Sequence, residues 1–247
     1  MIEVRDLRRS FGGIRALDGV TLSVPSGQRL AVIGPNGAGK TTLFNVLTGE
    51  LAATGGLVRL DGRDIGRDPP WRRARRGLGR MYQRNELFDS LTASDNVALA
   101  VAARAGPFRP FTMPPRSDRL AAGRLLDRVG LAARADVPSR DLSHGERRQL
   151  ELAVTLARGP RVLLLDEPTA GMSPTETARI VELIAGLERS LTVLIVEHDM
   201  DVVFRLADRI AVLHEGRVIA DGTSEEIHGD RQVHDVYLGK AVEAVER

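Results

Sequence analysis

The chain has 247 residues, of which 43% are hydrophobic and 28% charged, and its formal net charge is +2. These values are typical of a soluble globular protein, and the absence of cysteine excludes disulfides and thiolate metal ligands. The longest apolar runs fall far short of the ~18 residues that span a bilayer, and residues 1–7 lack the apolar stretch of a signal peptide. We therefore expect a protein of the cytosol or of the cytosolic face of a membrane.

Four short segments in the first part of the chain have the pattern of strands. Residues 2–7 alternate between apolar and polar side chains, and residues 20–24 end at Pro25. Residues 29–33 are mostly apolar, as expected of a strand in a sheet that is covered on both faces. Residues 57–60 and the following Asp-Gly predict an edge strand and a turn.

A phosphate-loop pattern follows the strand predicted at 29–33. Glycines allow the backbone N–H groups to point inward, where they and the positive end of the next helix bind phosphate oxygens. Lys40 would reach the β- and γ-phosphates, and the Thr41 hydroxyl would ligate Mg²⁺. An ordinary glycine-rich turn is the alternative, but Lys40 is one of two lysines against 33 arginines, which favours a specific need for a compact ammonium. The predicted ATP-binding residues of this loop are Gly34, Pro35, Asn36, Gly37, Ala38, Gly39, Lys40, Thr41 and Thr42.

Six arginines between residues 72 and 84 have few acidic neighbours. They are Arg72, Arg73, Arg75, Arg76, Arg80 and Arg84. The interleaved aromatic residues are limited to Trp71 and Tyr82, too few to favour nucleic-acid binding. We expect a solvated or partner-facing basic surface here, and no nucleic-acid partner.

The pattern changes at about residue 86. Residues 86–157 have helical periodicities and no convincing strand, and a proline-rich loop at 106–115 interrupts them. Ser143, three residues before Glu146, predicts a capping box at a helix start, yet Gly145 lies inside that box. Glycine weakens a helix by roughly 1 kcal/mol relative to alanine. Either the helix tolerates this loss or some group approaches the backbone closely at Gly145.

Strands return in the last third of the chain. They are predicted at 162–165, 192–196 and 210–213, and residues 217–220 follow a Glu-Gly turn and complete a hairpin. Strands that alternate with helices imply a parallel sheet covered on both faces. We therefore predict an α/β fold into which the helical stretch inserts as a lobe.

Three polar side chains follow the buried strands predicted in this part of the chain. Asp166 and Glu167 come directly after residues 162–165, at the sheet edge where ligands bind in such folds. Asp166 should hold Mg²⁺, directly or through water, and Glu167 is the candidate general base, a role worth ~10²–10⁴-fold in rate. His198 follows residues 192–196 and could hydrogen-bond the γ-phosphate and position the attacking water. The alternative is a pair of strand ends where polar groups simply reach solvent.

Together these residues resemble the ATP-binding subunit of an ABC transporter, with the family's order and spacing. After the phosphate loop come Gln83, the Leu-Ser-His-Gly-Glu segment at 142–146, the Asp166-Glu167 pair and His198. The segment departs from the family's usual Leu-Ser-Gly-Gly-Gln at its third and fifth positions. The resemblance implies a P-loop NTPase (ABC ATPase) core with a parallel sheet, an antiparallel β edge and an inserted helical lobe. The single domain at 1–247 would comprise an α/β nucleotide-binding core at 1–85 and 158–240 and a helical signature lobe at 86–157.

The resemblance also implies roles for individual residues. Two such subunits pair head to tail, so Ser143 and Gly145 of one would contact the γ-phosphate bound by the other. Phe11 would stack on adenine, although a core phenylalanine is the alternative. Gln83 would sense Mg²⁺ and link the core to the helical lobe. Ser173 stands where the family often has an aspartate.

Within the family, the likeness is greatest to importers of branched-chain amino acids and similar small polar solutes, through residues 44–49, 142–150, 197–203 and 236–239. It implies ATP and Mg²⁺ as cofactors and a peripheral position on the cytoplasmic face of the inner membrane. The implied partners are ABC permease subunits, a second ATPase subunit of the same or a related kind, and a periplasmic solute-binding protein. The alternatives are the ATPase of an exporter, for instance of lipopolysaccharide, and a soluble ABC ATPase that acts on DNA or the ribosome.

Overall fold

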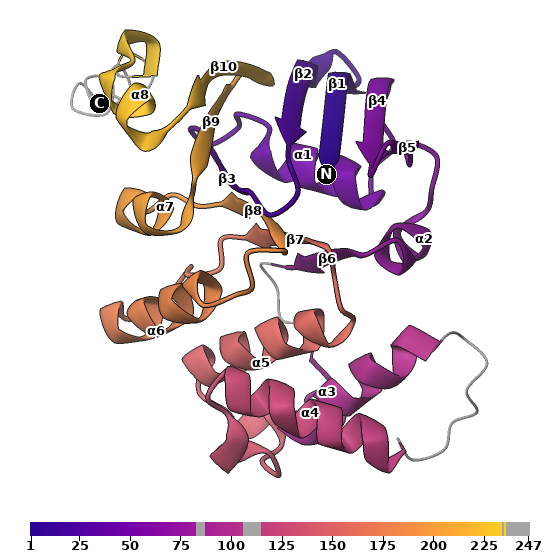
Figure 1. Ribbon diagram of the computed structural model, residues 1–247. Helices are drawn as coiled ribbons and strands as arrows, with labels where there is room; N and C mark the ends of the chain where they lie inside the picture. Colours follow the sequence, from indigo (N-terminus) through magenta and orange to yellow (C-terminus); the bar gives the residue numbers. More distant parts are fainter. Residues whose placement is uncertain (83–86, 106–114, 234, 236–247) are drawn as a thin grey trace.

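Two sheets and a group of helices form the protein, and a computed structural model describes residues 1–82, 87–105, 115–233 and 235. Figure 1 shows an antiparallel sheet at the top, a second sheet across the middle and the helices α3 (Ala93–Ala102), α4 (Arg116–Arg128) and α5 (His144–Ala157) at the bottom. The predicted fold class, an α/β core with an antiparallel edge and an inserted helical lobe, is confirmed.

The antiparallel sheet has the strand order β2-β1-β4-β5. Its strands are β1 (Ile2–Phe11), β2 (Ile14–Val24), β4 (Gly55–Leu60) and β5 (Arg63–Asp64). The alternation predicted at 2–7 is present, since Ile2, Val4 and Leu7 are buried in the core. The edge position predicted for residues 57–60 was wrong, because the two-residue strand β5 pairs with β4 on the side away from β1.

The second sheet has the order β10-β9-β3-β8-β7-β6. Its strands are β3 (Arg29–Ile33), β6 (Leu78–Met81), β7 (Val162–Asp166), β8 (Thr192–Val196), β9 (Arg209–His214) and β10 (Arg217–Gly222). All neighbours are parallel except β9 and β10, which form the predicted hairpin. Every residue of β3, β7 and β8 is buried, as apolar runs covered on both faces require. The carboxyl ends of these three strands therefore meet at one edge.

Helices cover the parallel sheet and form the lobe. Besides α3, α4 and α5 they are α1 (Lys40–Thr48), α2 (Pro70–Arg75), α6 (Pro174–Ala185), α7 (Met200–Leu206) and α8 (Ser224–Gly229). The lobe shares one apolar core with the sheet, because Val97, Leu126 and Leu150 belong to the same cluster as Leu163 and Leu165 of β7. In the described ranges, no helix combines the length and the apolar character needed to cross a membrane.

The prediction that the arginines at 72–84 form a basic surface was wrong for Arg73 and Arg80, because both side chains are buried. Arg73 on α2 is only 2% exposed, and its Nη1 donates to the carbonyls of Val46 and Leu47 at the end of α1. Carbonyls in the last turn of a helix lack the N–H groups of a following turn, and among the described backbone donors only the Gly49 N–H reaches Val46, at 3.3 Å. Arg73 therefore acts as a buried cap. The side chain of Arg80 is buried as well. Arg80 lies on strand β6, a strand that was not predicted from the sequence.

The remaining arginines of this group differ in their surroundings. Arg72 and Arg76 pair with Asp68 at 3.2 and 2.7 Å, and the guanidinium of Arg75 lies over the ring of Trp71. Arg84 lies outside the described residues, as do most of the proline-rich loop, the tail at 236–239 and Gln83.

Candidate functional site

The loop between β3 and α1 wraps around the side chain of Lys40. The Lys40 Nζ donates to the carbonyls of Gly34 at 2.6 Å and Pro35 at 3.0 Å, and the residue is 6% exposed. Gly39 has φ of 106°, and a Cβ there would lie 2.5 Å from the Ala16 carbonyl oxygen, so only glycine fits. The predicted ammonium inside a glycine-rich loop is therefore present.

The other predicted loop residues form the entrance to this cradle. Asn36, Gly37 and Thr41 are exposed, whereas Ala38 is buried against the core. The loop leads directly into the first turn of α1, whose N–H groups have no carbonyl partner within the helix. A chain segment of this shape binds phosphate groups through backbone donors and the helix dipole.

Phe11, the residue expected to stack on adenine, lies at the end of β1 and is 43% exposed. The guanidinium of Arg9 lies 4.5 Å from its ring centroid. The alternative of a core phenylalanine is therefore wrong. The adenine contact itself stays a prediction.

The three predicted polar residues lie at the ends of two adjacent strands, and the side chains of two of them are in contact. Glu167 follows β7 and His198 follows the adjacent β8, and His198 Nε2 lies 3.0 Å from Glu167 Oε1. In a hydrogen bond between these two atoms an ionised carboxylate accepts, so Nε2 is the donor. Glu167 also has φ of 47°, a left-handed conformation that is uncommon for residues other than glycine and that often marks functional sites.

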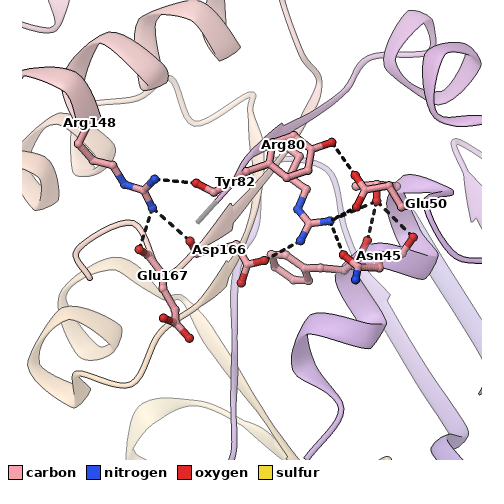
Figure 2. Close-up of polar contacts among 9 residues, drawn as sticks. Asn45, Glu50, Arg80, Tyr82, Arg148, Asp166 and Glu167 are labelled. Carbon is pink, nitrogen blue, oxygen red and sulfur yellow. Dashed lines mark hydrogen bonds and ion pairs between the residues drawn. The ribbon is translucent and has the colours of Figure 1, made fainter. Parts of the chain in front are cut away.

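Asp166 is held by Arg80, a buried arginine that was predicted to lie on a basic surface. Arg80 Nη2 donates to Asp166 Oδ2 at 2.6 Å, and Arg80 Nη1 donates to Asn45 Oδ1 at 2.6 Å and Glu50 Oε2 at 3.0 Å (Figure 2). Tyr82 Oη donates to the same Glu50 carboxylate at 2.5 Å. This network ties the end of α1 to the end of β7.

The two described side chains expected to hold Mg²⁺ carry oxygen donors of the kind that the ion prefers. The Thr41 hydroxyl, in the exposed first turn of α1, and the Asp166 carboxylate are hard oxygen donors. In the part of the chain that the structure describes, no group of three or more acidic, histidine or cysteine side chains could hold a metal. Mg²⁺ commonly uses one or two protein oxygens together with substrate phosphates, so two donors suffice. Gln83 lies outside the described residues and adds nothing to this test.

The capping box predicted at Ser143 is confirmed. Ser143 Oγ accepts from the Glu146 N–H at 3.2 Å, and Glu146 Oε2 accepts from the Ser143 N–H at 2.9 Å. Gly145 is also explained in part, because its N–H donates to Glu176 Oε1 at 3.1 Å. A Cβ at Gly145 would lie 2.6 Å from that oxygen. Within one chain, the group that closely approaches the backbone is thus the Glu176 carboxylate.

Glu176 belongs to the first turn of α6 and closes a second capping box. Ser173, which stands in the place of the expected aspartate, caps that helix, and its N–H and Oγ donate to Glu176 Oε2 at 3.0 and 2.8 Å. These hydrogen bonds, followed by the one from the Gly145 N–H, hold the pKa of Glu176 below its ordinary value. The start of α5 therefore already binds a carboxylate, and this supports the idea that it is suited to an anion.

Sequence reasoning missed two arginines of the site, Arg80 and Arg148. Arg80 gave no usable signal, since its partner Asp166 is 86 residues away. Arg148 did give one, because it lies on the buried face of α5 with Glu151 at i+3 and Leu152 at i+4. Two opposite charges at helical spacing on an apolar face predict a buried ion pair.

Comparison with known proteins gives consistent matches. The family model described as ABC transporter matches residues 17–170. The chain is 41% identical to the high-affinity branched-chain amino acid transport ATP-binding protein BraF of Pseudomonas aeruginosa, over 98% of both chains. Its structure is similar to the ADP conformation of MJ1267, an ATP-binding cassette of an ABC transporter, with a TM-score of 0.87, 29% identity and 97% and 98% of the two chains covered. It is also similar to the dimeric ABC transporter cassette MJ0796, with a TM-score of 0.79, 27% identity and coverage of 90% and 98%.

Proposed function

The chain belongs to the ABC transporter family and is an ATPase of that type, and from this premise we propose that it powers an importer of branched-chain amino acids or similar small polar solutes. The observation that carries the catalytic part is the contact between Glu167 and His198 beside the phosphate-loop strand β3. The solute class rests on the likeness to BraF, since the solute itself would be bound by other subunits.

In the proposed reaction, Lys40 and the loop N–H groups bind the phosphates, and Glu167 removes a proton from the attacking water. His198 holds the Glu167 carboxylate in one direction through the 3.0 Å contact. Its own contact with the γ-phosphate stays a prediction. Thr41 and Asp166 would hold Mg²⁺, with Gln83 as the proposed further ligand, and the ion would offset the charge of the phosphate oxygens.

We further propose that ATP is bound between two cassettes that pair head to tail. The start of α5 lies in the lower lobe, whereas the phosphate loop leads into α1 in the upper part of the molecule (Figure 1). Ser143 and Gly145 would therefore complete the nucleotide site of a second subunit. The neighbour MJ0796 is a dimer, which supports the pairing of two cassettes. The γ-phosphate would then compete with Glu176 for the Gly145 N–H.

A Gly145→Asp variant tests this composite site. We expect ATP to bind with an unchanged dissociation constant, because the substituted residue acts on the nucleotide of the opposite subunit. Hydrolysis should fall about 10²-fold, since the added carboxylate would place a negative charge beside the γ-phosphate and obstruct its approach to the Gly145 N–H. Calorimetry and phosphate release measure the two quantities.

Gly123→Asp is the matched control, because Gly123 lies on α4 with open space around its Cβ position. We expect wild-type turnover from this control. Full turnover by Gly145→Asp would remove the start of α5 from the mechanism.

Affinity purification of the tagged chain from its own membranes tests the transport role. We expect a membrane permease, a periplasmic solute-binding protein and an ATPase subunit, the same or related, to co-purify at the cytoplasmic face of the inner membrane. A permease without a binding protein would favour the exporter alternative. Ribosomes or DNA in place of membrane proteins would contradict the transport role.

A further inference from the structure

The buried guanidinium of Arg148 donates hydrogen bonds to the backbone of the turn at residues 166–168, which contains the candidate base Glu167. Arg148 lies on α5 and is 4% exposed. Its Nη2 donates to the carbonyls of Asp166 at 3.2 Å and Glu167 at 2.8 Å, and its Nε donates to the carbonyl of Pro168 at 3.0 Å. Three successive carbonyls, of the last residue of β7 and of the two residues after it, are therefore held by a single side chain.

The same guanidinium holds a second segment and a counter-charge. Arg148 Nη1 donates to the carbonyl of Tyr82 at 2.6 Å, directly before Gln83, and to Glu151 Oε2 at 2.8 Å. A guanidinium has five N–H donors in a fixed planar fork, and these five acceptors match that number. The carboxylate of Glu151 balances this charge locally. Burial raises the pKa of Glu151, and the nearby Arg148 guanidinium acts in the opposite direction. A lysine has three donors and no such fork, so it could not reproduce the arrangement.

The turn that Arg148 binds has an unfavourable backbone conformation at Glu167. Glu167 has φ of 47°, and a non-glycine residue keeps such a conformation only when its surroundings hold it. Two further hydrogen bonds help, from the Glu167 N–H to the Val196 carbonyl at 2.9 Å and from the Ala170 N–H to the Glu167 carbonyl at 3.2 Å. Arg148 is the side chain that holds this peptide from the direction of the lobe (Figure 2).

From this geometry we propose that Arg148 is a positioning residue that fixes the backbone of Glu167 and thereby aims its carboxylate. Figure 2 shows the Glu167 carbonyl facing Arg148 and the carboxylate pointing away from it. Arg148 therefore acts through the peptide and does not touch the reacting groups. Arg148 and Gly145 lie on α5 and Ser143 caps it, so one helix both holds the backbone of the base and carries the proposed phosphate contacts. The proposal rests on the proposed role of Glu167 as general base.

The first test is an Arg148→Met variant, which keeps the aliphatic stem and removes all five donors. We expect kcat to fall about 10- to 100-fold, the size of effect that a displacement of about 1 Å produces in a reacting group. The dissociation constant of ATP should stay within a factor of about two, because no phosphate contact is lost. Arg148→Lys should be intermediate and serves if the methionine variant does not fold. Arg124→Met makes the same change on the exposed face of α4 and should leave kcat unaltered.

A double-mutant cycle with Glu167→Gln distinguishes positioning from a general structural role. If Arg148 acts by aiming Glu167, then Arg148→Met should not lower the residual single-turnover rate of Glu167→Gln any further. Multiplied losses, an unchanged kcat of Arg148→Met, or a loss confined to ATP affinity would overturn the proposal. A normal rate in Glu167→Gln alone would instead overturn the assignment of the base, so the two failures are distinguishable.

Discussion

Glu167→Gln is expected to slow ATP hydrolysis about 10²–10⁴-fold, the usual contribution of a positioned general base. The amide keeps the size of the side chain but cannot accept the proton of the attacking water. Because Glu167 makes no bond to the phosphate loop in the mechanism proposed above, ATP should bind with an unchanged dissociation constant. Phosphate release under saturating ATP and calorimetry measure the two effects.

The same variant should accumulate as an ATP-bound dimer. If two cassettes close over nucleotide and hydrolysis opens them, a subunit that binds but cannot hydrolyse remains paired. Size-exclusion chromatography with ATP and Mg²⁺ should therefore show a dimer for Glu167→Gln and a monomer when nucleotide is omitted. Glu188→Gln makes the same change at an exposed glutamate and should behave as wild type. A monomeric Glu167→Gln in ATP and Mg²⁺ would contradict the assignment of the base.

The predicted positions of the site residues were confirmed where local sequence determines local structure, whereas their roles stay predictions. The loop around Lys40 depends on glycines that are adjacent in sequence, and the positions of Asp166, Glu167 and His198 follow from apolar runs that end in polar residues. Parallel strands bring such ends to one edge whatever the details of packing. These features needed only the period of each segment and the identity of the residue that follows it.

The prediction failed where a long side chain acts across the fold. Arg73 and Arg80 were interpreted by their neighbours in sequence, yet their acceptors come from α1 and β7. Strand β6 was missed because Leu-Gly-Arg-Met contains a glycine, which is depleted in strands, and an arginine, which is rarely buried unless it is paired. It forms because it pairs with β7 along the whole of its length. In the structure, a charge on a buried strand is stabilised by partners that local patterns do not reveal.

Lys40→Met is expected to weaken nucleotide binding, the step that precedes hydrolysis. A hydrogen bond to a charged group contributes about 1.5–3 kcal/mol, and about 1.4 kcal/mol corresponds to a tenfold change in affinity. Loss of the ammonium should therefore raise the dissociation constant of ATP about 10- to 100-fold. It also removes the bonds from Nζ to the Gly34 and Pro35 carbonyls, which hold the loop around the side chain. Calorimetry with ATP measures the affinity, and an unchanged value would refute the role.

Combining Lys40→Met with Glu167→Gln tests whether nucleotide binding must precede dimerisation. A chain that carries both Lys40→Met and Glu167→Gln should remain monomeric at an ATP concentration that locks Glu167→Gln into a dimer, because pairing requires bound nucleotide. Raising ATP by the factor lost in affinity should restore the dimer, since methionine removes binding energy and leaves the dimer surface intact. Lys240→Met makes the same chemical change at the other lysine of the chain and should leave both affinity and locking unaltered. A double variant that pairs at low ATP would show that dimerisation does not depend on the phosphate loop.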